Sequence, residues 1–350
     1  MIKQKIKKMD NSFRRIKKLL KENNYFFDLN ILYYIYKRNN YLFDPNRFFR
    51  SYKNVNIKHP IFLLGTQGNG NTFVSRMLRR SRNIISVTGN YKYWAGADEM
   101  NSVLGPILPK KFKSIEYLKP YPDKIKYPVD WLCGTDKYFP LFRNNESDFG
   151  IELKEQFTQV IRWLINRYGK NPNVRFLDKS QTFTIKMLLL EKIFQDSSPK
   201  FILVTRNPYA SCYRAATGNT YTKKYCGEDN NFLERLELAC QHWKNYNKTA
   251  TVDGEKVNYF MTLRFEDTLK FPEKNLRKIC NFIEIEYFPE MIPQKNDVIP
   301  FGSKRRDRWY PLRPDVNEKY LSKITNSEIE LIYNLCGKLA SSFGYLPPYK

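Results

Sequence analysis

The chain has 350 residues, 42% of them hydrophobic and 16% aromatic, which is enough for a sizeable core and argues against global disorder. No apolar run reaches the roughly 20 residues that cross a bilayer, and the N-terminus lacks an apolar signal segment, so a cytoplasmic protein is expected. Lysine and arginine outnumber aspartate and glutamate by 60 to 35, a net charge of +25 that attracts anionic ligands. A composition rich in lysine, asparagine, isoleucine and tyrosine accounts equally well for much of this excess.

Patterns typical of metal sites and disulfide frameworks are absent from the sequence. The six cysteines include no CxxC pair, and a disulfide framework is not expected in a chain this long. Only His59 and His242 are available as histidines, too few for a histidine-rich metal site. We therefore expect no metal.

Residues 1–57 differ from the rest of the chain and are expected to form a basic, helical extension. Their apolar residues recur at spacings of three and four, which predicts one stripe of an amphipathic helix. This stripe consists of Ile2, Ile6, Met9, Phe13, Ile16 and Leu20. Such a helix can dock on the domain surface, make a peripheral contact with an anionic membrane, or pair as a coiled coil. The sequence leaves these alternatives open, and docking on the domain is the commonest of them.

The main domain is expected to cover residues 58–350. Apolar runs predict strands at residues 61–64, 174–177, 201–205 and 257–263. Helical periodicity lies between and after them, at residues 72–82, 185–194, 232–246, 273–282 and 326–343. This alternation predicts an α/β fold with a central parallel sheet. Residues 84–150 show poor periodicity and are interpreted as an insertion that covers the acceptor side of the active face.

A glycine-rich loop follows the first predicted strand and precedes a helix. Gly65, four further residues, Gly70, Asn71 and Thr72 match the spacing of a phosphate-binding Walker A loop. Backbone N–H groups of such a loop and the positive end of the next helix bind phosphate without any charged side chain. Because Asn71 stands where that loop carries lysine, ATP or GTP hydrolysis is disfavoured. An ordinary strand–turn–helix corner is the alternative interpretation.

A second candidate phosphate site follows the strand at residues 201–205. Arg206, Asn207 and Pro208 come directly after it, and the proline starts a helix. An arginine at the carboxyl end of a parallel strand projects into the ligand crevice of an open sheet. Its guanidinium can then hold a terminal phosphate through two hydrogen bonds.

Together these segments resemble the sulfotransferases that use 3′-phosphoadenosine 5′-phosphosulfate (PAPS) as donor. GTQGNGNT resembles their 5′-phosphosulfate loop, ILVTRNPYASCYRA their 3′-phosphate motif, and LRFED their strand followed by an acidic pair. The helix at 273–282, the pair Arg308-Trp309 and the closing CGKLASSFGY are similar to later elements of that family, so the resemblance spans residues 58–345. It implies a three-layer P-loop-like α/β fold, PAPS as the donor substrate and no metal.

The resemblance also implies roles for individual residues. Those expected to hold the 5′-phosphosulfate are Gly68, Asn69, Gly70, Asn71 and Thr72. Arg206 would bind the 3′-phosphate; its usual serine partner is replaced by Arg214, so Arg214 itself or Ser211 would substitute. A basic loop containing Arg305 and Arg308 would close over the same phosphate.

The catalytic groups are less clearly marked. Gly68 stands where most of the family carries lysine or arginine, and Lys179 is our candidate for the missing cation. Glu99, with Asp98 second, is the candidate base that takes the proton of the acceptor. A surface lysine and a locally acting acidic pair are the alternatives for these residues.

The acceptor is expected to carry a hydroxyl or amine, and the positive charge favours a glycan. Two other functions compete with sulfuryl transfer. A P-loop kinase would need a cation on the γ-phosphate and a magnesium-binding acid. A non-catalytic polyanion-binding protein would need only the charge, although no nucleic-acid-binding module is recognisable. The sequence predicts no oligomeric state.

Overall fold

The computed structural model describes residues 29–31, 33–34, 51–87, 98–118, 130–169, 171, 173–217, 232–294 and 312–349. Most of the basic N-terminal extension lies outside these residues, as does the loop with Arg305 and Arg308. No helix in the described part of the chain is long and apolar enough to cross a membrane. The cytoplasmic location and the membrane contact of the N-terminal helix stay predictions.

Five parallel strands form the central sheet, in the order β2-β3-β1-β4-β5. Their bounds are β1 Ile61–Leu64, β2 Ile84–Ile85, β3 Arg175–Asp178, β4 Lys200–Thr205 and β5 Phe260–Arg264. Four of them confirm the strands expected from the sequence, while β2 was not predicted. β1 pairs with β4 along its whole length, from Ile61 opposite Lys200 to Leu64 opposite Leu203. The segments that follow β1 and β4 therefore emerge side by side.

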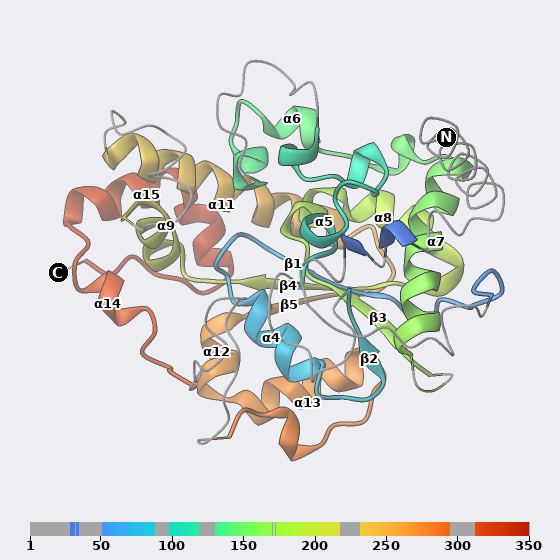
Figure 1. Ribbon diagram of the computed structural model, residues 1–350. Coiled ribbons are helices and arrows are strands. Elements are labelled where there is room, and N and C mark those ends of the chain that lie inside the picture. The colour runs from blue at the N-terminus through green and yellow to red at the C-terminus, as the bar shows by residue number, and fades with distance from the viewer. Residues whose placement is uncertain are drawn as a thin grey trace, which may run out of the picture.

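Helices cover both faces of the sheet, which gives the expected three-layer α/β architecture (Figure 1). Because side chains of a strand alternate between faces, Phe62 and Leu64 join one core cluster, and Ile61 and Leu63 join the other. The helices on the side of Ile61 are α4 Asn71–Leu78, α12 Phe265–Lys270 and α13 Pro272–Phe282; those on the side of Phe62 include α7 Ile151–Tyr168 and α8 Met187–Ile193. Such two-sided burial explains the continuous apolar runs of β1 and β4.

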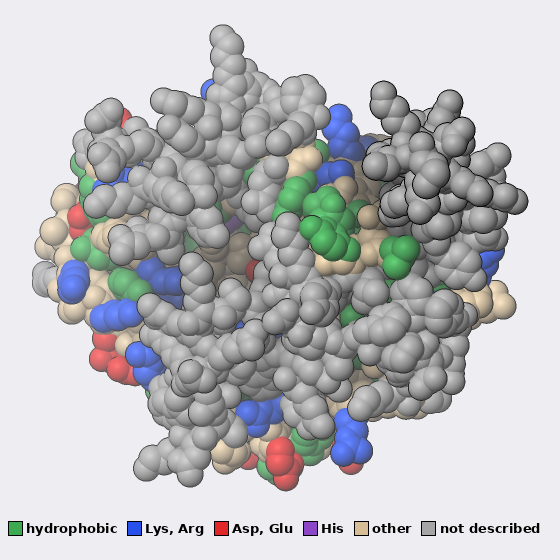
Figure 2. All heavy atoms as spheres, viewed as in Figure 1, with side chains coloured by type: hydrophobic (Ala, Val, Ile, Leu, Met, Phe, Trp, Pro, Cys, Tyr) green, Lys and Arg blue, Asp and Glu red, His purple; other side chains and the backbone are tan. Residues whose placement is uncertain are grey.

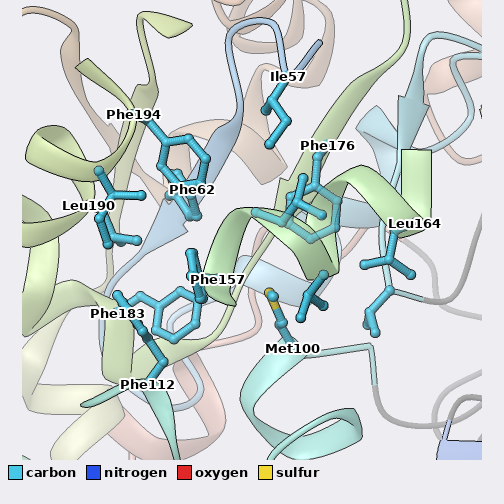
Figure 3. Packing of buried hydrophobic residues seen from close by; sticks show 14 of the residues in the cluster. Ile57, Phe62, Met100, Phe112, Phe157, Leu164, Phe176, Phe183, Leu190 and Phe194 are labelled. Carbon is cyan, nitrogen blue, oxygen red and sulfur yellow. The ribbon is translucent and has the colours of Figure 1, made fainter. Parts of the chain in front are cut away.

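Several phenylalanine rings pack together in the core on the α7 side (Figure 3). The ring of Phe62 lies 5.6 Å from that of Phe201 and 5.7 Å from that of Phe194, and Phe112 stacks on Phe157 at 4.0 Å. Each fully buried phenylalanine contributes about 1.5–3 kcal/mol relative to exposure. The strand that carries the glycine-rich loop is thus fixed by large, interlocking rings.

Three further helices pack together beside the sheet through a third cluster. They are α9 Pro208–Thr217, α11 Phe232–Gly254 and α15 Asn326–Ser342, with the short α14 Glu318–Leu321 against α9. α9 follows β4 directly, as the sequence predicts from the proline after Arg206. α11 reaches back to the glycine-rich loop with His242.

The described parts of residues 84–150 contain only β2 and short helical segments (Figure 1). These helices are α5 Met100–Val103, α6 Phe139–Phe142 and the 3-10 helices η1 Lys110–Phe112, η2 Ile115–Tyr117, η3 Asp130–Gly134 and η4 Glu146–Asp148. The interpretation of this segment as an insertion over the acceptor stays a prediction. Two more 3-10 helices, η5 Gln181–Lys186 and η6 Gln195–Ser197, flank α8, and η7 Pro289–Met291 follows α13.

Lysine and arginine side chains can be followed on one face of the molecule (Figure 2). In the coloured part of Figure 2, lysine and arginine side chains form several separate groups rather than one continuous stripe. Nucleic-acid-binding domains concentrate their basic residues on one face or along one helix. The described part of this face therefore gives no support to a nucleic-acid-binding function.

Candidate functional site

The candidate residues come together because they follow neighbouring parallel strands. Gly65 follows β1, Lys179 follows β3, Arg206 follows β4 and Phe265 follows β5. The carboxyl ends of parallel strands meet at one edge of the sheet, where open α/β sheets bind ligands. The candidate residues thus lie together at the carboxyl edge of the sheet.

The glycine-rich loop is held in a tight conformation by its own asparagines. The amide of Asn69 donates to the carbonyl of Val204 at 2.5 Å and to that of Leu64 at 3.3 Å, which ties the ends of β4 and β1 together. Its Oδ1 accepts from the backbone N–H of Asn71 at 3.2 Å. The side chain of Asn69 therefore stabilises the conformation of the loop. Because its amide is already bound to two backbone carbonyls, we do not assign this amide a role in ligand binding.

Gly70 marks the point where the loop becomes α4. Its φ of 107° lies in the left-handed region, and a Cβ there would overlap the ring of Phe265. The amide of Asn71 points back to the carbonyl of Leu63 at 3.2 Å. The N–H groups of Asn71 and Phe73 already donate to Oδ1 of Asn69 and to the carbonyl of Gly70, so the N–H of Thr72 and the helix dipole form the anion-binding position at the start of α4.

A cavity opens at this helix end. Its lining combines loop backbone with guanidinium groups and contains no carboxylate among the described residues. The lining residues are Gly68, Asn69, Gly70, Asn71, Thr72, Phe73, Arg76, Gln181, Arg206, Arg214 and Phe265. We refer to it as the donor cavity. It brings together the five predicted loop residues with Arg206 and Arg214.

Arg206 is held by neutral oxygen atoms. Its Nε and Nη2 donate to Oδ1 of Asn317 at 2.9 and 2.7 Å, and its Nη1 donates to the carbonyl of Gly68 at 2.8 Å. The guanidinium also lies over the ring of Phe265, 5.2 Å from its centroid. These contacts with amide and carbonyl oxygens orient the guanidinium at the end of β4.

Glu266 fixes the residue that orients Arg206. One carboxylate oxygen accepts from the amide of Asn317 at 2.6 Å and from the backbone N–H of Asn207 at 2.9 Å. The other accepts from the hydroxyl of Tyr345 at 2.9 Å. These contacts agree with a structural role for Glu266.

Lys179 lies in a buried ion-pair network. Its ammonium is 2.9 Å from Asp98 and 2.8 Å from Glu99, and Asp98 also pairs with Arg79 at 3.3 Å. Burial lowers the pKa of Lys179, but the two carboxylates more than offset this and raise it above its usual value. For Asp98 burial acts in the opposite direction and raises the pKa of the carboxyl group. The positive charges of Lys179, Arg76 and Arg79 outweigh this effect and hold that pKa below its usual value. The three predicted catalytic residues are thus brought together, as mutual partners.

Asp178 at the end of β3 anchors the segment that carries these carboxylates. It accepts from the backbone N–H of Met100 at 2.7 Å and from that of Ser180 at 2.6 Å. Burial raises its pKa to about 6. The start of α5 is thereby fixed against β3, which places Glu99 beside Lys179.

A second cavity adjoins the first, on the side of α9 and α11. It is lined by Thr66, Gln67, Gly68, Trp131, Ser211, Cys212, Arg214, Ala215, Ala239, His242 and Trp243. We refer to it as the α11 cavity. Ser211 lies here and not in the donor cavity; its Oγ is buried and has no hydrogen-bond partner among the described residues. Of the two residues proposed to replace the family's serine, Arg214 lines both cavities, whereas Ser211 lines only the α11 cavity.

Two site residues were missed from the sequence. Arg76 was not among the predicted site residues, yet it is only 3% exposed and lines the donor cavity. His242 was considered only as a possible metal ligand, yet its Nε2 lies 3.4 Å from the backbone nitrogen of Gln67 in the loop. Burial lowers the pKa of His242 to about 3, so its imidazole is neutral. No sequence signal linked either residue to the loop, because the contacts come from tertiary packing.

Comparison with known proteins gives the family. The sequence matches the model of the Sulfotransferase family over residues 60–290, whereas no curated protein matches it. Among solved structures, the sulfotransferase domain from the curacin biosynthetic pathway is 17% identical, with a TM-score of 0.50, over 83% of this chain and 99% of that domain. Sulfotransferase STF9 from Mycobacterium avium is 13% identical, with a TM-score of 0.51, over 85% of this chain and 80% of that one. These two likenesses concern the fold alone, and the family match covers most of the sheet and both phosphate motifs: the chain belongs to the sulfotransferase family.

Proposed function

We propose that this chain transfers a sulfuryl group from PAPS to a hydroxyl or amine of its acceptor. The observation that carries the proposal is the donor cavity, in which loop backbone and three arginines face the same space without a carboxylate among the described lining. Such a lining attracts a polyanion with phosphate groups at two ends.

The two ends of PAPS match the two halves of this cavity. The loop from Gly68 to Thr72 would bind the 5′-phosphosulfate through its N–H groups and the start of α4. Arg206 would bind the 3′-phosphate, which ATP lacks. A kinase is disfavoured because the amide of Asn71 is bound to Leu63 and supplies no charge to a γ-phosphate.

In sulfuryl transfer the acceptor oxygen attacks sulfur in line with the bridging oxygen of the 5′-phosphate. The protein contributes by positioning the two reactants and by stabilising the charge that develops on the leaving oxygen. The loop, which Asn69 ties to β4, can position the donor. The arginines that line the donor cavity can stabilise the charge on the leaving oxygen.

We propose Glu99 as the base for the acceptor proton. Its side chain is 22% exposed, whereas Asp98 is 5% exposed and engaged with Lys179 and Arg79, so Glu99 is better able to meet an acceptor. Lys179 would hold the carboxylate in position. Glu99→Gln should lower kcat by roughly 10²–10⁴-fold. An unchanged kcat would exclude this role.

We propose that the acceptor is a glycan, on the basis of the net charge of +25. Attraction of an anionic glycan is screened by salt, since the Debye length falls from about 10 Å at 0.1 M to about 3 Å at 1 M. Turnover of a sulfated oligosaccharide should therefore fall as salt is raised. Salt-insensitive turnover that is fastest on a neutral phenol would contradict the proposal.

The donor site is tested first by calorimetric titration with adenosine 3′,5′-bisphosphate, beside ATP and ADP. Micromolar binding of the bisphosphate, with much weaker binding of ATP, is the expected result. Arg206→Ala should weaken the bisphosphate by roughly a hundredfold, because a charge-assisted phosphate site is lost. Arg162→Ala is the matched control, since Arg162 lies on α7, pairs with Glu155 and lines neither cavity. Preference for ATP, or no nucleotide binding, would refute the proposed function.

A further inference from the structure

Gly68 and Arg214 form an unusual contact at the glycine-rich loop. Gly68 has a φ of 78° and no side chain, and the space that its Cβ would occupy is filled by the guanidinium of Arg214, with Nη1 nearest. Arg214 comes from α9, eight residues after Arg206. A cation from a different element thus lies directly against the loop backbone where the loop itself has none.

Arg214 lies in the wall between the two cavities. Gly68 and Arg214 are the residues that line both the donor cavity and the α11 cavity. The planar guanidinium offers five N–H donors in a rigid fork, so it can face groups on both sides of this wall. A sulfuryl group that passes from a donor on one side to an acceptor on the other would pass beside it.

The charge of Arg214 is not neutralised within the part of the chain that the structure describes. No carboxylate pairs with it there, and it lacks a hydrogen bond to any described residue. Lys179 differs, because Asp98 and Glu99 lie within 2.9 Å of its ammonium. An unpaired guanidinium stabilises an oxyanion more strongly than a cation already held by two carboxylates.

The α11 cavity has the composition expected of an acceptor site. Trp131, Trp243 and Ala239 give it apolar surface, while Gln67 and Ser211 add polar groups. His242, which is neutral, adds no second positive charge beside Arg214. An alcohol bound there would have its oxygen close to Gly68 and the transferring group.

We infer that Arg214 is a catalytic residue: its guanidinium supplies, from α9, the cation that Gly68 lacks and stabilises the charge on the transferring sulfuryl group between the two cavities. The inference rests on the proposed function. In the step, the bond between sulfur and the bridging oxygen of the donor breaks, and its electron pair stays on the 5′-phosphate. A new bond forms between sulfur and the acceptor oxygen, whose proton passes to water. Arg214 neither gains nor loses a proton.

The inference is tested by comparing PAPS with adenosine 3′,5′-bisphosphate, which lacks the sulfuryl group. Affinities of both are measured by calorimetry for the unchanged protein, Arg214→Ala, Arg214→Lys and Arg206→Ala. Arg214→Ala should weaken PAPS by roughly ten- to hundredfold, the effect of one charge-assisted contact, and leave the bisphosphate within about twofold. Arg206→Ala should weaken both ligands equally.

Turnover gives a second readout. Release of sulfate from PAPS, with water as acceptor, should fall by roughly a hundredfold in Arg214→Ala, and added methylguanidinium should restore part of it. Arg214→Lys should retain more activity than Arg214→Ala, while Arg162→Ala and thermal unfolding control for folding.

The outcomes separate the two ideas. If the unchanged protein binds neither nucleotide, the proposed function fails and the inference fails with it. If it binds both, and Arg214→Ala weakens both equally, Arg214 serves the 3′-phosphate as the sequence suggested and the catalytic role is overturned. Unchanged affinities and sulfate release in Arg214→Ala would also overturn it.

Discussion

Lys179 and Arg206 occupy the same position on the two strands that flank β1. Each is the first residue after a parallel strand, Lys179 after β3 and Arg206 after β4. Lys179 lies against two carboxylates, Asp98 and Glu99, whereas Arg206 lies against the amide oxygen of Asn317 and the carbonyl of Gly68. In these contacts one cation meets two carboxylates, and the other meets neutral oxygen atoms.

The comparison of Lys179 with Arg206 shows that a position at the end of a strand brings a cation to the candidate site but does not determine the role of that cation. The role depends on the charge of the partners, which come from distant segments: Asp98 and Glu99 precede α5, and Asn317 precedes α14. A neutralised cation stabilises the fold and orients its carboxylates. A cation with neutral partners remains available to an anionic ligand.

The largest effect is expected on stability, from Lys179→Met. The substitution leaves Asp98 and Glu99 buried or half-buried without their ammonium, and breaking such a buried pair lowers the free energy of unfolding by about 3–5 kcal/mol. Urea unfolding measures the change. Lys154→Met is the matched control, because Lys154 pairs with the exposed Asp196 at 2.9 Å and should lose about 1 kcal/mol at most. Equal effects in the two variants would show that the network around Lys179 is not stabilising.

The next effect is expected on donor binding, from Arg206→Lys. A lysine keeps the charge but cannot bind Asn317 and Gly68 at once in the fork that fixes the guanidinium. Affinity for adenosine 3′,5′-bisphosphate should fall roughly tenfold or more, measured by calorimetry, with little change in thermal stability. If lysine binds the nucleotide as tightly as arginine, the geometry of the guanidinium does not matter and only its charge does.

Much of the fold follows from the sequence because β1 and β4 are buried on both faces and therefore read as continuous apolar runs. β2 has only two residues, too few for any periodicity to show. α7 was missed although Phe157, Val160, Ile161 and Leu164 follow helical spacing and are buried in the structure. The sequence pattern that predicts α7 was therefore present, unlike any pattern for β2.

The site was predictable where one short segment carries it, as in the loop from Gly68 to Thr72. It was not predictable where a side chain reaches another segment. Nothing near Gly68 in the sequence indicates that the guanidinium of Arg214 lies against it. Likewise, Arg76 is buried rather than solvated because α4 packs close to Asp98, a carboxylate whose position depends on the fold.

His242 extends the comparison, since here burial removes a charge instead of pairing it. Its pKa is about 3 in the folded protein and about 6.5 when exposed, so between these values the unfolded chain binds a proton that the native state does not. Stability therefore falls as the pH is lowered through 6.5, by about 2 kcal/mol from this group between pH 7 and 5. Urea unfolding at both pH values should show a smaller loss in His242→Gln, whose amide oxygen can still accept from Gln67. A steeper or unchanged loss in that variant would mean that other groups cause the acid sensitivity.

The smallest effect is expected from Asn317→Ala, which tests the neutral partner directly. Arg206 would lose both bonds to Oδ1 and keep that to Gly68, so affinity for the bisphosphate should fall about fivefold, the effect of roughly 1 kcal/mol. Asn317→Asp is the sharper variant, because it gives Arg206 a carboxylate partner like those of Lys179. If neutral partners are what keep Arg206 available to phosphate, the aspartate must weaken binding more than the alanine, although it preserves the acceptor oxygen. Tighter binding in the aspartate variant would show that the orientation of Arg206, and not the neutrality of its partner at position 317, limits the affinity of this site.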